Sequence, residues 1–121
     1  MSAPTTPADC VFCKIVRGEI PSKKVHEDEL VLAFHDIRGV APVHVLVIPK
    51  PHVASLAECG MEHEATLGRM LGVAPQIARD LGATDGFRTI INTGRDGRQE
   101  VYHLHMHVIG GRDTGPMILR P

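Results

Sequence analysis

The sequence predicts an α+β domain in which an antiparallel sheet is packed against separate helices. Short apolar, β-branched segments lie on both sides of one long amphipathic segment, and this order is typical of that class. Neither an internal repeat nor a linker divides the 121 residues. We therefore expect residues 1–9 to form a disordered leader and residues 10–121 to form a single domain.

The elements expected before the long helix are one short helix and three strands. The segment "VFCKIVRGEIPS" predicts a short helix that ends at Gly18 and Pro21. The segments "KKVHEDE" and "LVLAFHDI" predict two strands joined by an acidic turn at Asp28. The apolar segment "HVLVIPK" predicts a buried strand that ends at its prolines.

Residues 61–81 carry apolar side chains at helical spacing and predict the long amphipathic helix. Gly82 provides a C-terminal stop, and Pro75 predicts a kink or an irregular turn within the helix. Two further strands are expected after it, from "FRTIINTG" and "HLHMHVI". The polar, glycine-containing loop "GRDGRQ" lies between them.

Composition narrows the class of protein and of partner. Hydrophobic residues make up 43% of the chain and the formal net charge is −1, which does not favour a nucleic-acid or membrane partner. No apolar run approaches the roughly 20 residues of a membrane span, and the N-terminus lacks the features of a secretory signal. An odd number of cysteines without such a signal predicts a reducing, cytoplasmic location.

Three alternating histidines, His103, His105 and His107, are the strongest indication of chemistry. In a strand they share one face, while the apolar residues between them share the other and pack on the core. Three interpretations remain open: a solvated histidine-rich edge strand, a zinc site, and a neutral imidazole that attacks phosphorus. The loop "NTGRDGRQ" before the strand resembles an anion cradle and favours phosphate chemistry.

Cys10 and Cys13 have the spacing of a zinc-binding pair. By itself this spacing leaves a metal site, a redox pair and a chance occurrence open. No thioredoxin-like βαβ pattern surrounds the pair, and Cys59 has no partner at such spacing.

The segment "HLHMHVI" resembles the signature of the histidine triad (HIT) family of nucleotide hydrolases and transferases. The segments "FCKIVRGEIPS", "LAFHDI", "APVHVLVIPKPH", "INTGRDGRQEVYHLHMHVIGGR" and "GPM" resemble its Hint branch, in the same order. This resemblance implies an antiparallel sheet of about five strands with one long and one short helix, extended across a homodimer. It also implies hydrolysis of purine nucleoside 5′-phosphoramidates, including aminoacyl adenylates, through a nucleotidyl-histidine.

The resemblance also implies a role for each matching residue. His105 is the expected nucleophile, His107 contacts the phosphate, and His44 lies beside the nucleophile. The expected nucleotide-binding residues are Phe12, Ile20, Phe34, Asp36, Ile37, Asn92, Arg98, Gln99, Glu100, His105 and His107. Among them, Asp36 matches the ribose-binding carboxylate, and the apolar residues match the slot for the base. Arg98 and Glu100 stand where members of this branch often have glycine and serine.

Related proteins hold a structural zinc with a cysteine pair, a histidine after the "IPK" strand and the first triad histidine. The resemblance therefore implies a site formed by Cys10, Cys13, His52 and His103, and it implies no catalytic metal. Three alternatives to the phosphoramidase remain: a dinucleoside polyphosphate hydrolase, a nucleotide- or partner-binding protein with vestigial catalysis, and a zinc hydrolase that uses two triad histidines.

Overall fold

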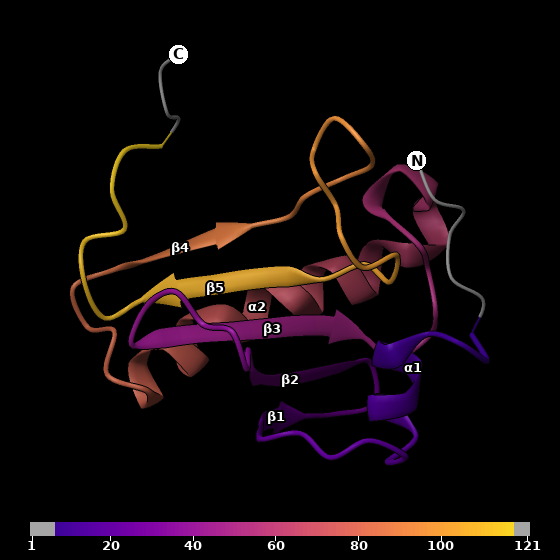
Figure 1. Ribbon diagram of the computed structural model, residues 1–121, viewed down its shortest axis with the longest axis horizontal. Helices are drawn as coiled ribbons and strands as arrows, with labels where there is room; N and C mark the ends of the chain where they lie inside the picture. The colour runs from indigo at the N-terminus through magenta and orange to yellow at the C-terminus, as the bar shows by residue number, and fades with distance from the viewer. Residues whose placement is uncertain (1–6, 118–121) are drawn as a thin grey trace.

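The computed structural model describes residues 7–117, which form one five-stranded antiparallel sheet with two α-helices (Figure 1). The strand order is β1-β2-β3-β5-β4, so β1 and β4 are the edges. The strands are β1 (Lys24–Glu27), β2 (Val31–His35), β3 (Val43–Pro49), β4 (Phe87–Ile90) and β5 (Met106–Gly110). Because β3 precedes the long helix and β5 comes after it, the pairing of these two strands joins the N-terminal and C-terminal parts of the chain.

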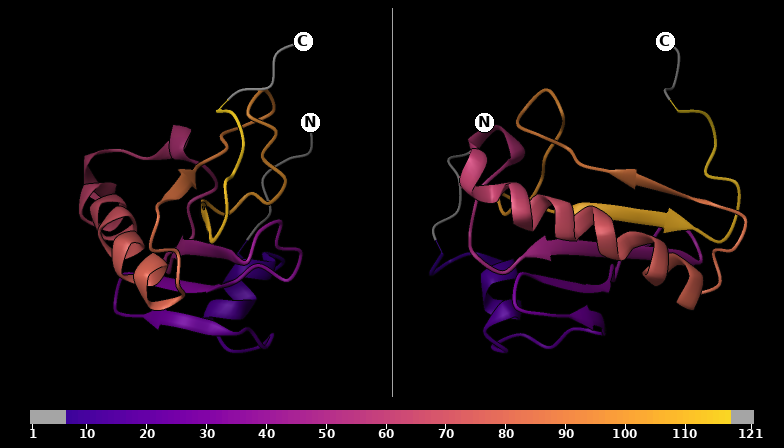
Figure 2. Two further views of the ribbon diagram at one scale, coloured as in Figure 1. Left: turned by 90° about the vertical axis from the view of Figure 1, so that its left-hand side faces the viewer. Right: turned by 180° about the vertical axis from the view of Figure 1, so that it is seen from behind.

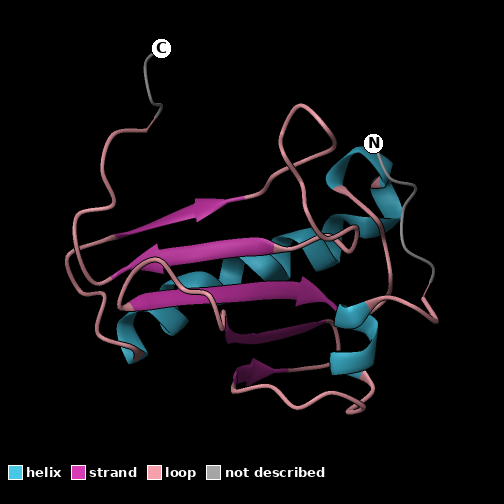
Figure 3. Cartoon of the chain, viewed as in Figure 1, coloured by secondary structure: helices cyan, strands magenta, loops and turns pink. Residues whose placement is uncertain are grey.

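The sheet lies between two helical layers (Figures 2 and 3). Helix α2 (Glu64–Asp80) runs along one face, and the short helix α1 (Val11–Val16) lies at one end of the other face. Two 3₁₀ turns, Leu56–Glu58 and Met61–His63, lead from β3 into α2. Within the described part of the chain, no helix is long and apolar enough to cross a lipid bilayer.

Strand β3 is buried along its whole length because both of its faces are covered. Successive side chains of a strand point to opposite faces, so its apolar residues divide between two cores. Val43, Val45 and Val47 pack with α2, whereas Leu46 and Ile48 pack with α1. His44 alternates with the valines and therefore points to the α1 face.

The predicted elements are confirmed in type, and their ends differ. The first turn of the expected helix 61–81 is the 3₁₀ turn Met61–His63, and α2 then continues as an α-helix through Pro75. Both helices are followed by glycines in the left-handed region, Gly18 (φ 79°) and Gly82 (φ 94°), which confirms the predicted stops.

The final strand is shorter than expected because β5 begins at Met106. Its pairing with β3 ends at Val47, close to Pro49 and Pro51, which have no N–H group to extend the ladder. The N–H of Leu104 instead donates to the carbonyl of Val53 in the loop after β3. His103 and His105 therefore lie on the extended approach to β5, and only His107 lies within the strand. Strand β4 likewise ends at Ile90 rather than continuing to residue 94.

Truncation of Met106 is expected to destabilise the fold. Its side chain is fully buried between the sheet and α2, so Met106→Ala removes apolar contacts and leaves a cavity. We expect the free energy of unfolding in urea to fall by about 2–5 kcal/mol. Met61→Ala is the matched control, because Met61 is 83% exposed and its loss should change stability by no more than about 0.5 kcal/mol. Equal effects of the two substitutions, at one protein concentration, would contradict this account of the core.

Candidate active site and metal cluster

The alternation of the histidines with apolar residues is confirmed, although only part of the segment is a strand. Leu104, Met106 and Val108 all belong to the core beneath α2. The three histidines point to the opposite face, where the ring of Phe12 from α1 meets His103 and His105 edge to face, at centroid distances of 5.8 and 5.3 Å. The rings of His105 and His107 also meet, at 5.2 Å. Helix α1 therefore closes one side of the histidine cluster.

His105 is held with one ring nitrogen available for chemistry. Its Nδ1 lies 2.8 Å from the carbonyl oxygen of His103, which can only accept, so Nδ1 carries the proton. The lone pair of the neutral ring is then on Nε2. Burial lowers the pKa of His105, against the opposing effects of the His103 carbonyl and the carboxylates of Asp36 and Glu100. The ring is consequently neutral at pH 7, as a nucleophile must be.

His44 and His107 form a second pair whose protons are also fixed by the backbone. The N–H of Val40 donates to His44 Nδ1 at 3.1 Å, so the proton of the neutral His44 ring is on Nε2. This Nε2–H lies 2.9 Å from His107 Nδ1 and donates to it, which leaves the proton of His107 on Nε2. Burial, together with the neighbouring His105 and His44, lowers the pKa of His107 to about 4, against the opposing effect of Asp36.

Asp36 completes this group. Its Oδ2 lies 3.3 Å from His44 Nε2, and its Oδ1 accepts the N–H of Arg38 at 2.8 Å. The ligand atoms of Asp36, His44 and His107 are close enough to share a metal ion. A metal on His44 Nε2 would require the proton to move to Nδ1, which already faces the N–H of Val40. The hydrogen bonds therefore favour a network of neutral histidines over a metal site here.

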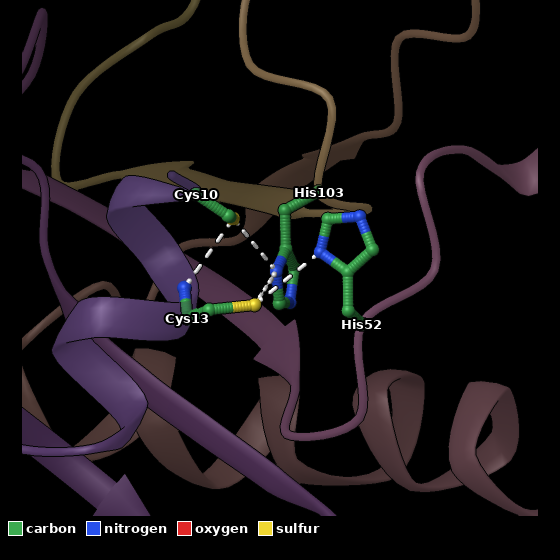
Figure 4. A group of neighbouring side chains, drawn as sticks. All are labelled: Cys10, Cys13, His52 and His103. Atoms are coloured by element: carbon green, nitrogen blue, oxygen red, sulfur yellow. Dashed lines mark hydrogen bonds between the residues drawn. The ribbon is translucent and has the colours of Figure 1, made fainter. Parts of the chain in front are cut away.

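Cys10, Cys13, His52 and His103 form a separate cluster whose four ligand atoms lie within 4.8 Å of one another (Figure 4). His103 Nδ1 lies 3.3 Å from Cys10 Sγ and 3.5 Å from Cys13 Sγ, and His52 Nδ1 lies 3.3 Å from Cys13 Sγ. Tetrahedral zinc with ordinary bond lengths separates sulfur and nitrogen ligands by about 3.5 Å. The donor types and spacings thus fit a zinc ion.

The surroundings of the cluster also suit a metal. His103 Nε2 donates to the carbonyl of Pro49 at 2.8 Å, which leaves the Nδ1 lone pair directed at the sulfurs. Burial lowers the pKa of His103 to about 4, so its ring is neutral. Cys10 precedes α1, and its Sγ accepts the N–H of Cys13. Burial and the bond with Cys10 raise the pKa of the metal-free Cys13 thiol to about 11.

The side chain of Gln99 joins the ends of the loop that is expected to bind phosphate. The Gln99 amide donates to the carbonyls of Ala54 and Val101, and its oxygen accepts the N–H of Gly94. The side chain is buried, and these three hydrogen bonds support the loop. Arg98 has φ 60°, in the left-handed region that glycine prefers. Asn92 is half-buried, whereas Arg98 and Glu100 are exposed.

The apolar residues expected around the base are only partly brought together. Phe12 and Phe34 are buried and pack edge to face at 5.7 Å, with Ile20 against the same cluster. Ile37 is 97% exposed and does not pack with them. A closed slot formed by all four residues is therefore absent from the described part of this single chain, and Ile37 lies open to a ligand.

Sequence reasoning missed two of the groups that fix the histidine protons. These groups are the carbonyl of Pro49 and the N–H of Val40. Backbone groups are present at every residue, so no pattern of side chains identifies them. The rule that metal-bound and catalytic histidines need a partner for the second nitrogen was the only available signal.

A family model described as the HIT domain matches residues 17–114. The chain is 51% identical over 111 residues to the purine nucleoside phosphoramidase of Escherichia coli K12, which covers 91% of this chain and 93% of that protein. It is also 51% identical over 102 residues to protein HitA of Neisseria gonorrhoeae, covering 84% of this chain and 95% of that one.

Solved structures agree with the fold. A histidine triad protein from Clostridium difficile superposes with a TM-score of 0.87 at 44% identity, covering 98% of this chain and all (100%) of that one. A zinc-bound histidine triad family protein from Mycobacterium smegmatis superposes with a TM-score of 0.79 at 38% identity, covering 95% of this chain and 84% of that one. The chain therefore belongs to the HIT family.

Proposed function

We propose that this protein hydrolyses purine nucleoside 5′-phosphoramidates through a covalent nucleotidyl intermediate on His105. The observation that carries the proposal is the neutral His105 ring, whose proton is held on Nδ1 by the His103 carbonyl while Nε2 keeps its lone pair. The substrate class is supported by the likeness to the Escherichia coli protein named purine nucleoside phosphoramidase.

In the first half of the reaction, His105 Nε2 attacks phosphorus, a nitrogen–phosphorus bond forms, and the bond to the leaving amine breaks. The leaving amine takes a proton from water. His107 Nε2–H donates to a phosphoryl oxygen, since its other nitrogen already accepts from His44. The modified His105 ring is cationic, and the His103 carbonyl and nearby carboxylates of Asp36 and Glu100 favour this charge.

In the second half, water attacks phosphorus, the bond to His105 Nε2 breaks, and the water proton passes to solvent. The products are the nucleoside monophosphate and the free enzyme. In this proposal Asp36 accepts a hydrogen bond from a ribose hydroxyl, and Phe12, Phe34, Ile20 and Ile37 contact the base. The backbone of the loop fixed by Gln99 offers N–H groups to the phosphate.

We also propose that Cys10, Cys13, His52 and His103 bind a structural zinc ion. Bound there, the ion would join the start of α1 and the loop after β3 to the approach to β5. It would also fix the position of His103, whose carbonyl orients the nucleophile. The zinc-bound relative from Mycobacterium smegmatis supports the choice of metal. Thiolate ligands require a reducing compartment, in keeping with a cytoplasmic location.

A homodimer is the proposed working form. Strand β4 is an edge of the sheet, and Phe87 at its start is 40% exposed. An unpaired edge with an exposed aromatic ring is suited to association with a second copy. The family resemblance supports a sheet that extends across this two-fold contact.

Replacement of the nucleophile tests the proposed reaction. His105→Ala should lower turnover of adenosine 5′-phosphoramidate by on the order of a thousandfold or more, because no intermediate can form. The affinity for AMP, measured by calorimetry, should change by less than about threefold, since the phosphate and base contacts remain. His63→Ala is the control, because His63 lies in a 3₁₀ turn outside the site. Substantial turnover by His105→Ala, or AMP binding without any turnover by the unaltered protein, would contradict the proposal.

Metal content tests the zinc site. Protein purified without added zinc should contain about one zinc per chain by mass spectrometry. Cys13→Ser should lose most of this zinc and melt at a lower temperature, because the remaining ligands are incomplete. Cys59→Ser should keep both, since Cys59 lies outside the cluster. Zinc content well below one per chain in the unaltered protein would contradict the site, and turnover that depends on chelatable zinc would favour a zinc hydrolase.

The His107 ring should remain neutral well into the acidic range, with a pKa near the lowered value of about 4. Unfolding restores a pKa of about 6.5, so the unfolded chain binds more protons between these values. The contribution of His107 to the free energy of unfolding therefore falls as the pH falls through this window. Long-range ¹H–¹⁵N spectra of the imidazole nitrogens give the midpoint directly. A midpoint near 6.5 in the folded protein would show that the ring is not buried in this way.

A further inference from the structure

The loop between β2 and β3, residues 36–42, sets the proton positions of His44 and His107, yet it buries little of itself. Residues 37–40 are all exposed, so packing of their side chains does not hold the loop. Its hydrogen bonds are those from the Arg38 N–H to Asp36, from the Asp36 N–H to the carbonyl of His44, and from the Val40 N–H to His44 Nδ1. The last of these bonds is the one on which the histidine network depends.

Arg112 holds the same loop from outside. Its Nη2 donates to the carbonyl oxygen of Val40 at 2.5 Å. Both backbone groups of Val40 are therefore hydrogen-bonded, the carbonyl to Arg112 and the N–H to His44. Arg112 follows the end of β5, and Gly111 (φ 87°) turns the chain towards the loop. A Cβ at Gly111 would lie 2.9 Å from Pro42 Cβ, which shows how closely the two segments pack.

We propose that Arg112 is a positioning residue for the histidine triad. Its guanidinium holds the Val40 carbonyl and thereby keeps the Val40 N–H on His44 Nδ1. His44 then presents Nε2–H to His107, and His107 presents Nε2–H to the substrate. Arg112 itself touches neither the triad nor the proposed path of the reacting atoms. The kinetic consequence rests on the proposed phosphoramidase reaction, whereas the proton positions do not.

The physical basis is that a neutral histidine exchanges its two tautomers readily unless a partner fixes one. A displaced Val40 N–H would free His44 Nδ1 to carry the proton. His44 Nε2 would then face His107 Nδ1 with two lone pairs opposed, and one ring would have to turn or gain a proton. Loss of Arg112 should therefore disturb His44 and His107 together and leave His105 with its separate partner, the His103 carbonyl.

The test compares two arginines whose side chains both donate to backbone carbonyls. Arg112→Met removes the donors and keeps most of the side-chain length. Arg88→Met is the matched control, because Arg88 donates to Gly115 O at 2.7 Å and makes no bond to the 36–42 loop. Arg112→Lys keeps the charge and one donor for the Val40 carbonyl.

In the full-length protein, Arg112→Met should mix the tautomers of His44 and His107 in long-range ¹H–¹⁵N spectra, with His105 unchanged. It should lower kcat for adenosine 5′-phosphoramidate by about tenfold, because the hydrogen bond from His107 to the phosphoryl oxygen is partly lost, and change KM by less than about twofold. Arg112→Lys should recover part of both effects, and Arg88→Met should show neither.

Unchanged tautomers and unchanged kcat in Arg112→Met would overturn the inference, as would an equal effect of Arg88→Met. Should Arg112→Met fail to fold, Gly111→Ala displaces the same segment and must give the same changes for the inference to stand. If the unaltered protein shows no phosphoramidate turnover, the proposed function fails. The tautomer measurement then decides the role of Arg112 by itself.

Discussion

The residue on which the site depends most is His103, because it belongs to two groups at once. Its imidazole faces the sulfurs of Cys10 and Cys13, and its carbonyl oxygen accepts a hydrogen bond from the Nδ1–H of His105. Rotation of this one residue would disturb the cysteine–histidine cluster and the proposed nucleophile together. The carbonyl of Pro49 prevents it by holding the remaining nitrogen. A residue two positions before the proposed nucleophile is thus held by four partners, Cys10, Cys13, Pro49 and His105.

The neutral state of the triad follows from burial and from the choice of partners. Carbonyls and N–H groups fix the tautomers without adding charge, unlike the carboxylate that commonly orients a catalytic histidine. Burial lowers the pKa of all three triad rings, and so keeps His105 neutral and His107 an N–H donor at neutral pH. Asp36 and Glu100 add negative charge near His105, where a cationic intermediate would form.

Sequence patterns predicted most of the fold because alternation and helical spacing are properties of side chains. The strand "HVLVIPK" was expected to be buried, and both of its faces are covered. The predicted start of the last strand, His103, is three residues too early. The prolines at the end of β3 limit how far β5 can pair with that strand, and no pattern within the last strand itself indicates this limit. The alternating histidines left metal and catalysis open, and only the family resemblance separated His103 from His105. The hydrogen bonds from Gln99 to the Ala54 carbonyl and from Arg112 to the Val40 carbonyl join residues far apart in the sequence, so no local pattern predicts them.

The contact between Cys10 and His103 joins positions 93 residues apart. Such a contact closes a loop of most of the chain, and the entropy of that closure delays it until the sheet has formed. The four ligands of the cluster therefore come together late in folding. An ion that binds them stabilises interactions absent from the folding transition state, so it acts by slowing unfolding rather than by speeding folding. In a cell, the cluster would determine how long a folded molecule lasts more than how quickly it forms.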